Sequence, residues 1–479
     1  MQRQIYHRSV LDLQKRSKMK NVYFIGIGGI GMSAIARYYN HAGYNVSGYD
    51  KTPSKLTGKL EEEGISIHYT ADINCVPKDI AETLVIYTPA IPKDMEELVY
   101  AQEKGYRLIK RSRALGEIAS TQKCLGVAGT HGKTSTSTML SHLFTHSGAG
   151  CSAFLGGISK NYHTNLLLSK NPVLVAEADE FDRSFLQLFP DIAVITSTDA
   201  DHLDIYGDAA TMKEAFAEFA SQIKPQGALI LKKGVEINLS NVKAKVYSYS
   251  YKEKADFSPE NVELLEGGYF RFNLVYPAFS TIYGEEVPAG VIEGCTVGIP
   301  GWVNVENGIA AAASALIGGI APEKVKDALA AFQGVERRFD IHINTPKVAY
   351  IDDYAHHPQE LSSAITSIRN IFPGRKITAI FQPHLYTRTR DFAEGFAQSL
   401  SMVDELMLLD IYPATELPIE GVTSQIIFDK VTIGKKTLLK KEEVLDFLKG
   451  KEIDILVTFG AGDIDRLIVP IEEMLKERL

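Results

Sequence analysis

The stretch that decides the fold is CLGVAGTHGKTSTSTML, residues 124–140, where an apolar run stops at two closely spaced glycines and a lysine. The apolar run predicts a buried strand, and the residues from Lys133 onward predict a helix. Gly129 and Gly132 allow a tight turn between the two, and the first turn of the helix presents unpaired backbone N–H groups. Because such groups bind phosphate, the turn is predicted to be a phosphate loop.

The residues that follow the turn suit a nucleotide. Lys133 can reach the terminal phosphates, and the hydroxyl of Thr134 or Ser135 can ligate a phosphate-bound Mg²⁺. The general P-loop pattern has another glycine five residues before Gly132, where this chain has Val127. A glycine-rich turn without a ligand is the structural alternative, and the immediate Gly-Lys-Thr favours the nucleotide site.

Length and composition narrow the class of protein. The 479 residues exceed the size of a single core and suggest about three domains. A hydrophobic content of 45% is typical of a soluble protein, and the net charge of -8 argues against nucleic acid as a partner. The cysteines do not have the spacing of zinc ligands, so we expect no structural zinc site. The sequence has no apolar run of about 18 residues, so we expect no membrane span. The basic segment 1–18 lacks a signal peptide's apolar core, which predicts an N-terminal extension and a cytoplasmic location.

A second glycine-rich turn lies in NVYFIGIGGIGMSAIARYYNHAGYNVSGYD, residues 21–50. The pattern predicts a strand, a turn, a helix and a second strand that ends at Asp50. Gly26, Gly28 and Gly31 fit the dinucleotide spacing G-x-G-x-x-G, and Asp50 lies where an acidic residue would meet a ribose hydroxyl. Any diphosphate could bind such a turn, and tight packing of helix against sheet without a ligand is the alternative.

Two strands after the phosphate loop end abruptly in polar residues, in VLVAEADE (173–180) and AVITSTDADHLD (193–204). Ligands bind at the carboxyl ends of strands in an open α/β sheet, so Lys133, Glu177, Asp179 and His202 are expected to converge. Glu177, His202 and Thr134 then form a site for a hard cation, either Mg²⁺ or Mn²⁺. Alternatively, these strand-end side chains hydrogen-bond loop backbone.

A third α/β alternation begins after FQGVERRFD, residues 332–340. Its strand ends carry a group of acidic and basic side chains: Asp352, Asp353, His356, His384 and Arg388. Arginine binds carboxylate or phosphate in bidentate fashion, which suits anion capture, although a solvated loop fits the spacing equally well. We therefore predict three tandem α/β domains: a Rossmann-like domain over residues 19–121, a P-loop ATPase-type domain over 122–335 and a Rossmann-like domain over 336–479.

Five motifs in this order resemble the Mur ligases of peptidoglycan synthesis: AGTHGKT, EADEFDRSF, DADHLD, DDYAHHP and QPHLYTRTRD. The resemblance runs from Asn21 onward and implies ATP and Mg²⁺ as cofactors and a C-terminal domain that closes over the substrates. GIGGIGMS, residues 26–33, is most similar to the alanine-adding members, where it holds the diphosphate of a UDP-sugar. The small-molecule substrates implied are UDP-N-acetylmuramate and L-alanine, joined through an acyl phosphate. Phe181 departs from the family pattern and leaves the roles of Glu180 and Asp182 open.

The resemblance also implies roles for individual residues. The ATP-binding positions are Gly129, Thr130, His131, Gly132, Lys133, Thr134, Ser135, Asn304, Asn307, Arg338 and Asp353. The substrate-binding positions are Gly28, Gly29, Ile30, Gly31, Ser33, Asp50, Tyr354, His384 and Arg388. The metal ligands are Thr134, Glu177 and His202, and the catalytic positions are Lys133, His356 and Arg388. His356 is a candidate base for the amine, with a structural hydrogen-bonding role as the alternative.

Three other functions compete with this reading. An NAD-dependent oxidoreductase would explain residues 21–50 and leave the phosphate loop without a role. A nucleotide-gated binding module without catalytic activity would explain the phosphate loop, but the histidines and arginines of the third domain would then have no role. The nearest rival is a ligase of the same family that joins a murein tripeptide to UDP-N-acetylmuramate. The sequence leaves the oligomeric state open.

Overall fold

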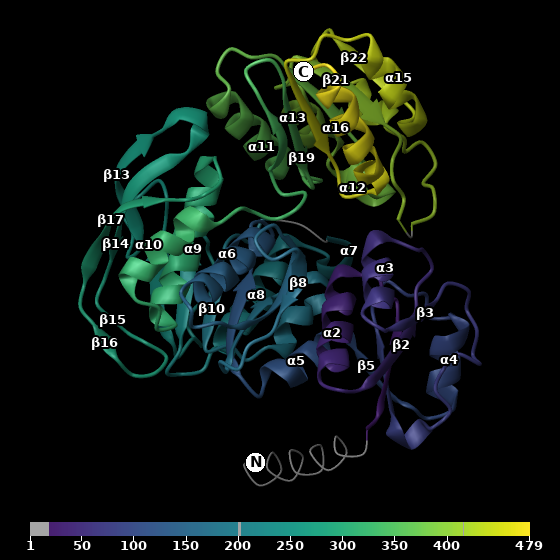
Figure 1. The fold of residues 1–479 in the computed structure, drawn as a ribbon, viewed down its shortest axis with the longest axis vertical. Helices are drawn as coiled ribbons and strands as arrows, with labels where there is room; N and C mark the ends of the chain where they lie inside the picture. Colours follow the sequence, from purple (N-terminus) through teal and green to yellow (C-terminus); the bar gives the residue numbers. More distant parts are fainter. Residues whose placement is uncertain (1–18, 200–202, 415) are drawn as a thin grey trace. The chain divides into compact units, whose positions relative to one another are not determined.

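The computed structural model describes residues 19–199, 203–414 and 416–479 (Figure 1). These residues group into two compact units, which we describe separately. The first unit comprises Met1–Ser258, Tyr276–Gly290 and Ala310–Ala328, and the second comprises Pro259–Val275, Val291–Ile309 and Leu329–Leu479. Within the described ranges, none of the helices has the length and apolar character needed to cross a membrane.

The first unit contains a five-stranded parallel sheet in the order β3-β2-β1-β4-β5. Its strands are β1 (Asn21–Ile25), β2 (Asn45–Tyr49), β3 (Ser66–His68), β4 (Thr83–Tyr87) and β5 (Arg107–Lys110). Its helices are α2 (Ile30–His41), α3 (Lys55–Glu62), α4 (Glu96–Glu103) and α5 (Arg111–Ala119), with a 3₁₀ turn η1 (Ile80–Glu82). The strand order reverses at β1, which pairs with β2 on one side and β4 on the other. Ligands bind beyond the carboxyl ends of strands at such a switch point, which puts the first glycine-rich turn where a ligand is expected.

The same unit contains a seven-stranded sheet in the order β12-β11-β10-β6-β9-β7-β8. Its strands are β6 (Lys123–Ala128), β7 (Ser152–Ser159), β8 (Thr164–Leu167), β9 (Val173–Glu177), β10 (Ile192–Ile195), β11 (Ala228–Lys232) and β12 (Lys245–Tyr249). All neighbours are parallel except β7 and β8. The helical elements are α6 (Lys133–His146), η2 (Phe181–Gln187), α7 (Leu203–Tyr206), α8 (Ala209–Ser221) and α10 (Pro322–Ala331), and a small pair is β15 (Phe279–Ser280) with β16 (Glu286–Val287). The phosphate loop and Glu177 therefore follow adjacent parallel strands.

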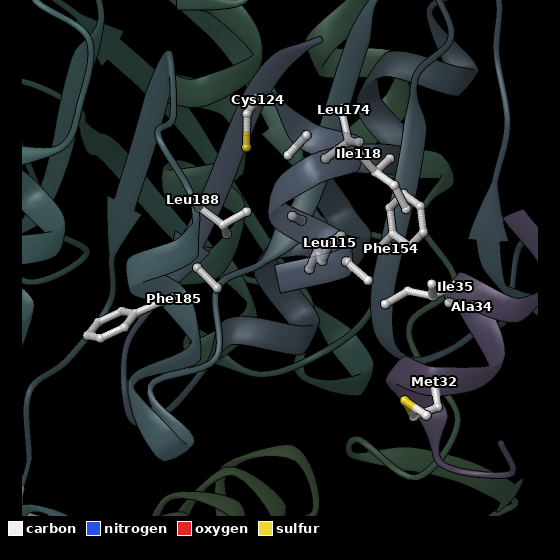
Figure 2. Packing of buried hydrophobic residues seen from close by; sticks show 14 of the residues in the cluster. Met32, Ala34, Ile35, Leu115, Ile118, Cys124, Phe154, Leu174, Phe185 and Leu188 are labelled. Carbon is white, nitrogen blue, oxygen red and sulfur yellow. The ribbon is translucent and has the colours of Figure 1, made fainter. Parts of the chain in front are cut away.

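One hydrophobic core joins the two sheets of the first unit. Leu115 and Ile118 of α5 pack in the same buried cluster as Ile35 of α2, Phe154 of β7 and Leu174 of β9 (Figure 2). The apolar face of α5 repeats every three to four residues, as expected for a helix that contacts a core on one side. Because the two glycine-rich turns share this core, their positions relative to each other are set by packing.

The second unit contains a six-stranded sheet in the order β18-β19-β23-β20-β21-β22. Its strands are β18 (Asp340–Asn344), β19 (Ala349–Asp353), β20 (Ile377–Phe381), β21 (Glu405–Leu409), β22 (Lys436–Leu439) and β23 (Ile455–Phe459), all parallel to their neighbours except β18. The helical elements are α11 (Pro358–Ile371), α12 (Tyr386–Asp391), α13 (Ala393–Leu400), α14 (Gln425–Phe428), η4 (Lys441–Glu443), α15 (Val444–Lys449), η5 (Asp463–Leu467) and α16 (Ile468–Lys476). Strands β19, β20 and β23 are almost entirely buried and mostly apolar, and polar side chains gather at and beyond their carboxyl ends.

A smaller sheet has the strand order β13-β14-β17. Its strands are β13 (Ser258–Leu264), β14 (Phe270–Tyr276) and β17 (Gly290–Thr296), with η3 (Glu266–Gly268), and α9 (Trp302–Ile317) follows. The predicted α/β class with three tandem α/β domains is confirmed, while the boundaries near residues 122 and 336 stay predictions.

Candidate functional site

The phosphate loop connects β6 to α6 through a backbone that requires glycine. Gly129 has a φ of +134°, and a Cβ there would lie 2.0 Å from the Oγ1 atom of Thr196. Gly132 occupies the N-cap of α6 with a φ of +80°, and no side chain caps that helix. Thr134 is buried and Ser135 partly exposed in the first helical turn. The N–H groups of this turn are therefore available to an anion.

Two residues after β10 hold the loop in place. Ser197 accepts a hydrogen bond from the His131 N–H through Oγ at 2.9 Å and from the Thr130 N–H through its carbonyl at 3.2 Å. The two hydroxyls of Thr130 and Ser197 lie 2.9 Å apart, and Thr196 Oγ1 donates to the His131 carbonyl. Sequence reasoning missed Thr196 and Ser197, since they lie more than sixty residues from the loop.

Lys133 is held by acidic neighbours. Its Nζ donates to the Gly129 carbonyl at 2.7 Å and to Glu180 at 2.9 Å, and Glu180 is buried. Burial alone would lower the pKa of Lys133, but the carboxylates of Glu180, Asp179 and Glu177 together raise the pKa above its ordinary value. The lysine is therefore charged at neutral pH, and the strand-end residues Lys133, Glu177 and Asp179 do converge, as predicted. Glu180, whose role the sequence left open, is the lysine's direct partner.

The predicted metal ligands are only partly described. Thr134 lies in the first turn of α6, and Glu177 ends β9, where its Oε2 accepts the Gly156 N–H at 3.2 Å. His202 lies outside the described residues. Among residues 19–199, 203–414 and 416–479, no group of three or more His, Cys, Asp or Glu side chains is arranged around a common metal position. The hydroxyl and carboxylate donors beside several acidic groups nevertheless fit a hard cation such as Mg²⁺.

The first glycine-rich turn is braced by the acid that was expected to meet a ribose. Asp50 accepts the Gly28 N–H at 2.7 Å and the Thr52 N–H at 3.1 Å. Gly29 is the N-cap of α2, which begins at Ile30 and has no side-chain cap, so its first N–H groups are open to an anion. The predicted ribose contact of Asp50 stays a prediction, and its observed role is to shape the turn.

Ser33, another predicted substrate contact, is fully buried in α2. Its Oγ donates to the Ile30 carbonyl at 2.9 Å and accepts from Asn165 Nδ2 at 3.0 Å. Asn165 comes from β8, and its amide also donates to the Ile30 carbonyl. The contacts that Ser33 makes therefore tie α2 to the neighbouring sheet.

A cavity of about 280 Å³ reaches from the first glycine-rich turn to the end of β9. The cavity is lined by residues from the elements around both sheets of the first unit: Gly29, Gly31, Thr88, Arg111, Glu177 and Phe181. Arg111, the first residue of α5, donates to Asp179 at 2.9 Å, and a Cβ on Gly31 would lie 2.7 Å from its Nη1. Sequence reasoning did not find Arg111, because nothing in its own segment marks it. The cavity joins a turn suited to a diphosphate with a site suited to a metal.

In the second unit, the structure brings the predicted residues of two strand ends together. Tyr354 and His356 follow β19, while His384 and Arg388 follow β20. The ring centroids of Tyr354 and His356 lie 5.4 Å apart and those of His356 and His384 lie 6.1 Å apart. Arg388 is 7% exposed. A buried arginine and two histidines at one sheet edge form a site suited to an anion.

The charges at this edge are tuned by burial. Burial, with His356 and Arg388 as neighbours, lowers the pKa of His384 to about 3, so this ring is neutral at pH 7. Burial raises the pKa of Asp353 to about 7 against the opposing effect of Arg338. Arg338 lies over the Tyr354 ring, with 4.8 Å between its Cζ and the ring centroid. His384 is therefore a poor proton acceptor.

The remaining predicted ATP contacts, Asn304 and Asn307, lie on α9. Both side chains are buried, at 8% and 7% exposure. Asn304 Nδ2 donates to the Pro300 carbonyl at 2.7 Å, which fixes its amide at the start of the helix. A role of either amide near adenine stays a prediction.

Three family models match consecutive parts of the chain. The Mur ligase family catalytic domain matches residues 21–123, the Mur ligase middle domain residues 127–315 and the Mur ligase glutamate ligase domain residues 337–462. The chain belongs to the Mur ligase family. The phosphate loop and Glu177 of this Mur ligase lie in the middle-domain match, and Tyr354 to Arg388 lie in the third match.

Named relatives support the placement within the Mur ligases. UDP-N-acetylmuramate–L-alanine ligase of Parabacteroides distasonis is 51% identical over 468 residues, which cover 97% of this chain and 99% of that one. The crystal structure of UDP-N-acetylmuramate-alanine ligase from Thermotoga maritima has a TM-score of 0.78 at 26% identity and covers 96% of this chain and 100% of that chain. A murein peptide ligase from Psychrobacter arcticus, 20% identical with a TM-score of 0.69, covers 95% of this chain and 98% of that chain and is similar in fold.

Proposed function

We infer that this Mur ligase joins L-alanine to the lactyl carboxylate of UDP-N-acetylmuramate at the expense of ATP, a step in making the peptidoglycan precursor in the cytoplasm. The observation that carries the inference is the cavity that runs from the first glycine-rich turn to Glu177, close to the charged Lys133. It would give a sugar diphosphate and a nucleoside triphosphate adjoining sites in one unit. The full-length relatives named for this reaction supply the identity of the substrates.

The reaction has two steps. An oxygen of the lactyl carboxylate attacks the γ-phosphorus of ATP, the bond to the β-phosphate oxygen breaks, and ADP leaves. The amine of alanine then attacks the acyl carbon, loses a proton and expels inorganic phosphate. Both steps gather negative charge on the transferred phosphoryl group, so preorganised positive groups supply most of the stabilisation.

We assign the phosphate contacts to the phosphate loop and its lysine. The open N–H groups from Gly132 onward would bind the β- and γ-phosphates, and Lys133 would exchange Glu180 for a phosphate oxygen. Thr134 and Glu177 would hold Mg²⁺, with His202 as the third predicted ligand, and the ion would neutralise phosphate charge. Mn²⁺ suits the same donors.

The sugar nucleotide would bind in the cavity. The N-terminal N–H groups of α2, at Ile30 and Gly31, would receive the diphosphate, since no side chain caps this helix. The lactyl end would then lie toward Glu177 at the end of β9, while Arg111 lies between Gly31 and Asp179. This arrangement would bring the attacking carboxylate beside the proposed metal ligand Glu177.

The second unit would supply contacts to the reacting carboxylate and to alanine through Tyr354, His384 and Arg388. His356 remains the candidate base for the amine, because the pKa of about 3 makes His384 a weak acceptor. The His356 Nδ1 lies 3.0 Å from the Tyr354 carbonyl and 3.4 Å from Glu360, an arrangement that orients its ring. Arg338 and Asp353 are the proposed ATP contacts of this unit.

The decisive experiment measures phosphate release from ATP with UDP-N-acetylmuramate and each amino acid in turn. We expect turnover that requires both the sugar nucleotide and L-alanine and that NAD does not affect. Turnover with the murein tripeptide in place of L-alanine would favour the recycling ligase. ATP hydrolysis without the sugar nucleotide, or saturable NAD binding, would overturn the proposal.

A further inference from the structure

The turn at residues 335–338 holds an arginine where glycine is the usual residue. The Arg338 N–H donates to the Val335 carbonyl at 3.2 Å, which closes a four-residue turn. Arg337, its third residue, has a φ of +62°. This left-handed conformation is unfavourable for any residue with a Cβ, and turns of this kind favour glycine at that position. Strain of this type persists only where the surroundings enforce it.

The side chain of Arg337 makes the contacts that hold its own backbone in the left-handed conformation. Its Nε donates to Asp352 Oδ2 at 3.1 Å and its Nη2 donates to the Gly460 carbonyl at 2.6 Å. Asp352 lies in β19 with a fully buried side chain, and its other oxygen accepts from Thr458 Oγ1 of β23 at 2.6 Å. One guanidinium thus fastens the turn to the ends of two neighbouring strands.

The backbone of the turn is tied to the same sheet. The Tyr354 N–H donates to the Arg337 carbonyl at 2.7 Å, and the Phe339 N–H donates to Asp353 Oδ2 at 2.9 Å. These contacts bring the Arg338 guanidinium over the Tyr354 ring. We propose that Arg337 is a positioning residue: its clasp on Asp352 and Gly460 fixes the turn that presents Arg338 and Asp353 to ATP. The inference rests on the proposed function, because it takes ATP as the ligand of Arg338.

Removing the clasp has a defined electrostatic consequence. Burial raises the pKa of Asp352 even with Arg337 beside it, so the carboxylate depends on that cation. Without Arg337, a buried and uncompensated charge remains, which is strongly destabilising. Asp352→Asn in the Arg337→Ala background removes this charge and separates loss of positioning from loss of folding.

The test compares Arg337→Ala, Arg337→Gly and Arg337→Lys in the full chain by steady-state kinetics. We expect Arg337→Ala and Arg337→Gly to raise KM for ATP roughly tenfold and to raise KM for L-alanine and the sugar nucleotide less, since the Arg337 guanidinium also lies 5.2 Å from the Tyr354 ring centroid. Glycine relieves the backbone strain and still lacks the clasp. Lysine cannot reproduce the forked contact, so it is expected to recover only part of the loss. The Arg337→Ala/Asp352→Asn variant should regain thermal stability while its KM for ATP stays high.

Arg375 provides a matched control, since it makes a similar clasp on Asp454 at the amino-terminal edge of the same sheet. Arg375→Ala should lower the thermal midpoint and leave KM for ATP unchanged. Wild-type KM for ATP in Arg337→Gly, or an equal rise in Arg375→Ala, would overturn the positioning role. Failure of the proposed function would instead appear in the wild-type protein, as turnover that does not require UDP-N-acetylmuramate and L-alanine.

Discussion

Two carboxyl edges of the larger sheets carry the candidate chemistry, and the groups proposed to meet the ligands differ: carboxylates around a lysine at one edge, and an arginine beside a neutral histidine at the other. At the phosphate loop, Glu177, Asp179 and Glu180 surround one lysine and hold it charged. At the edge of β19 and β20, the buried Arg388 lies beside His384, which remains neutral at pH 7. An acidic edge favours cations and a basic edge favours anions. The same topological position has thus been adapted to a metal and nucleotide in one unit and to an anionic reactant in the other.

The largest effect is expected from Lys133→Ala. Loss of the charge that meets the terminal phosphates should lower turnover by at least about a thousandfold, because Lys133 is the cation that the phosphate loop itself supplies. Steady-state phosphate release measures the loss. Calorimetric binding of UDP-N-acetylmuramate should be unchanged, and weakened sugar binding would show that the two glycine-rich turns are not separate sites.

Removing Lys133 also leaves Glu180 buried without its cation. Lys133→Ala/Glu180→Gln is therefore the matched control, since it removes both charges. The double variant should be as inactive as the single one and thermally more stable. Recovered turnover in the double variant would mean that Lys133 acts only by neutralising Glu180.

The basic edge is tested by Arg388→Ala. Loss of one preorganised charged contact to a reacting carboxylate or phosphate costs about 3 kcal/mol, so turnover should fall on the order of a hundredfold. Lysine at this position should recover little, because the proposed contact is planar and bidentate. Binary affinities for ATP and the sugar nucleotide, measured by calorimetry, should be nearly normal, and near-normal turnover would return Arg388 to a structural role.

A smaller effect is expected from Glu177→Gln at the acidic edge. Glutamine keeps an oxygen for the Gly156 N–H and removes the charge that would bind the metal. The Mg²⁺ concentration that gives half-maximal turnover should rise about tenfold. An unchanged metal titration would mean that Glu177 only hydrogen-bonds the backbone of β7.

The smallest effect concerns the pH dependence of stability. The pKa of His384 is lowered to about 3 in the folded protein, whereas the ordinary pKa of a histidine is near 6.5. Between these two pH values the unfolded chain therefore binds a proton at His384 and the folded protein does not. Stability contributed by the neutral ring is therefore present above about pH 6.5 and is lost as the pH falls toward about pH 3. His384→Phe keeps the ring stacked on Tyr412 and removes the titration, so its thermal midpoint should fall less between pH 7.5 and pH 5. Equal slopes for the two proteins would contradict the assignment.

A structural element can be predicted from the sequence where neighbouring residues determine its conformation. The apolar run before Gly129, the glycines and Lys133 predicted the phosphate loop, because strand, turn and helix are encoded by neighbouring residues. The convergence of Glu177 and Asp179 on that lysine followed from the rule that parallel strands end at one edge.

The remaining contacts depend on register and helix phase, which no local pattern encodes. Thr196 and Ser197 brace the phosphate loop from a strand more than sixty residues away. Arg111 reaches the cavity from a helix whose sequence shows only an amphipathic pattern. Asp50 has the right spacing for a ribose contact, which stays a prediction, and its carboxylate accepts the N–H of Gly28 in the first glycine-rich turn, 22 residues earlier.

The opposite preferences of the two edges are tested most directly by titrating Mg²⁺ against turnover in Glu177→Gln and Arg388→Ala under identical conditions. Glu177→Gln should shift the half-maximal metal concentration upward, about tenfold, and approach wild-type turnover at saturating metal. Arg388→Ala should keep the wild-type metal midpoint and reach only about a hundredth of the turnover. A shifted metal midpoint in Arg388→Ala, or an unshifted midpoint in Glu177→Gln, would contradict the assignment of the metal to the acidic edge and the anionic reactant to the basic one.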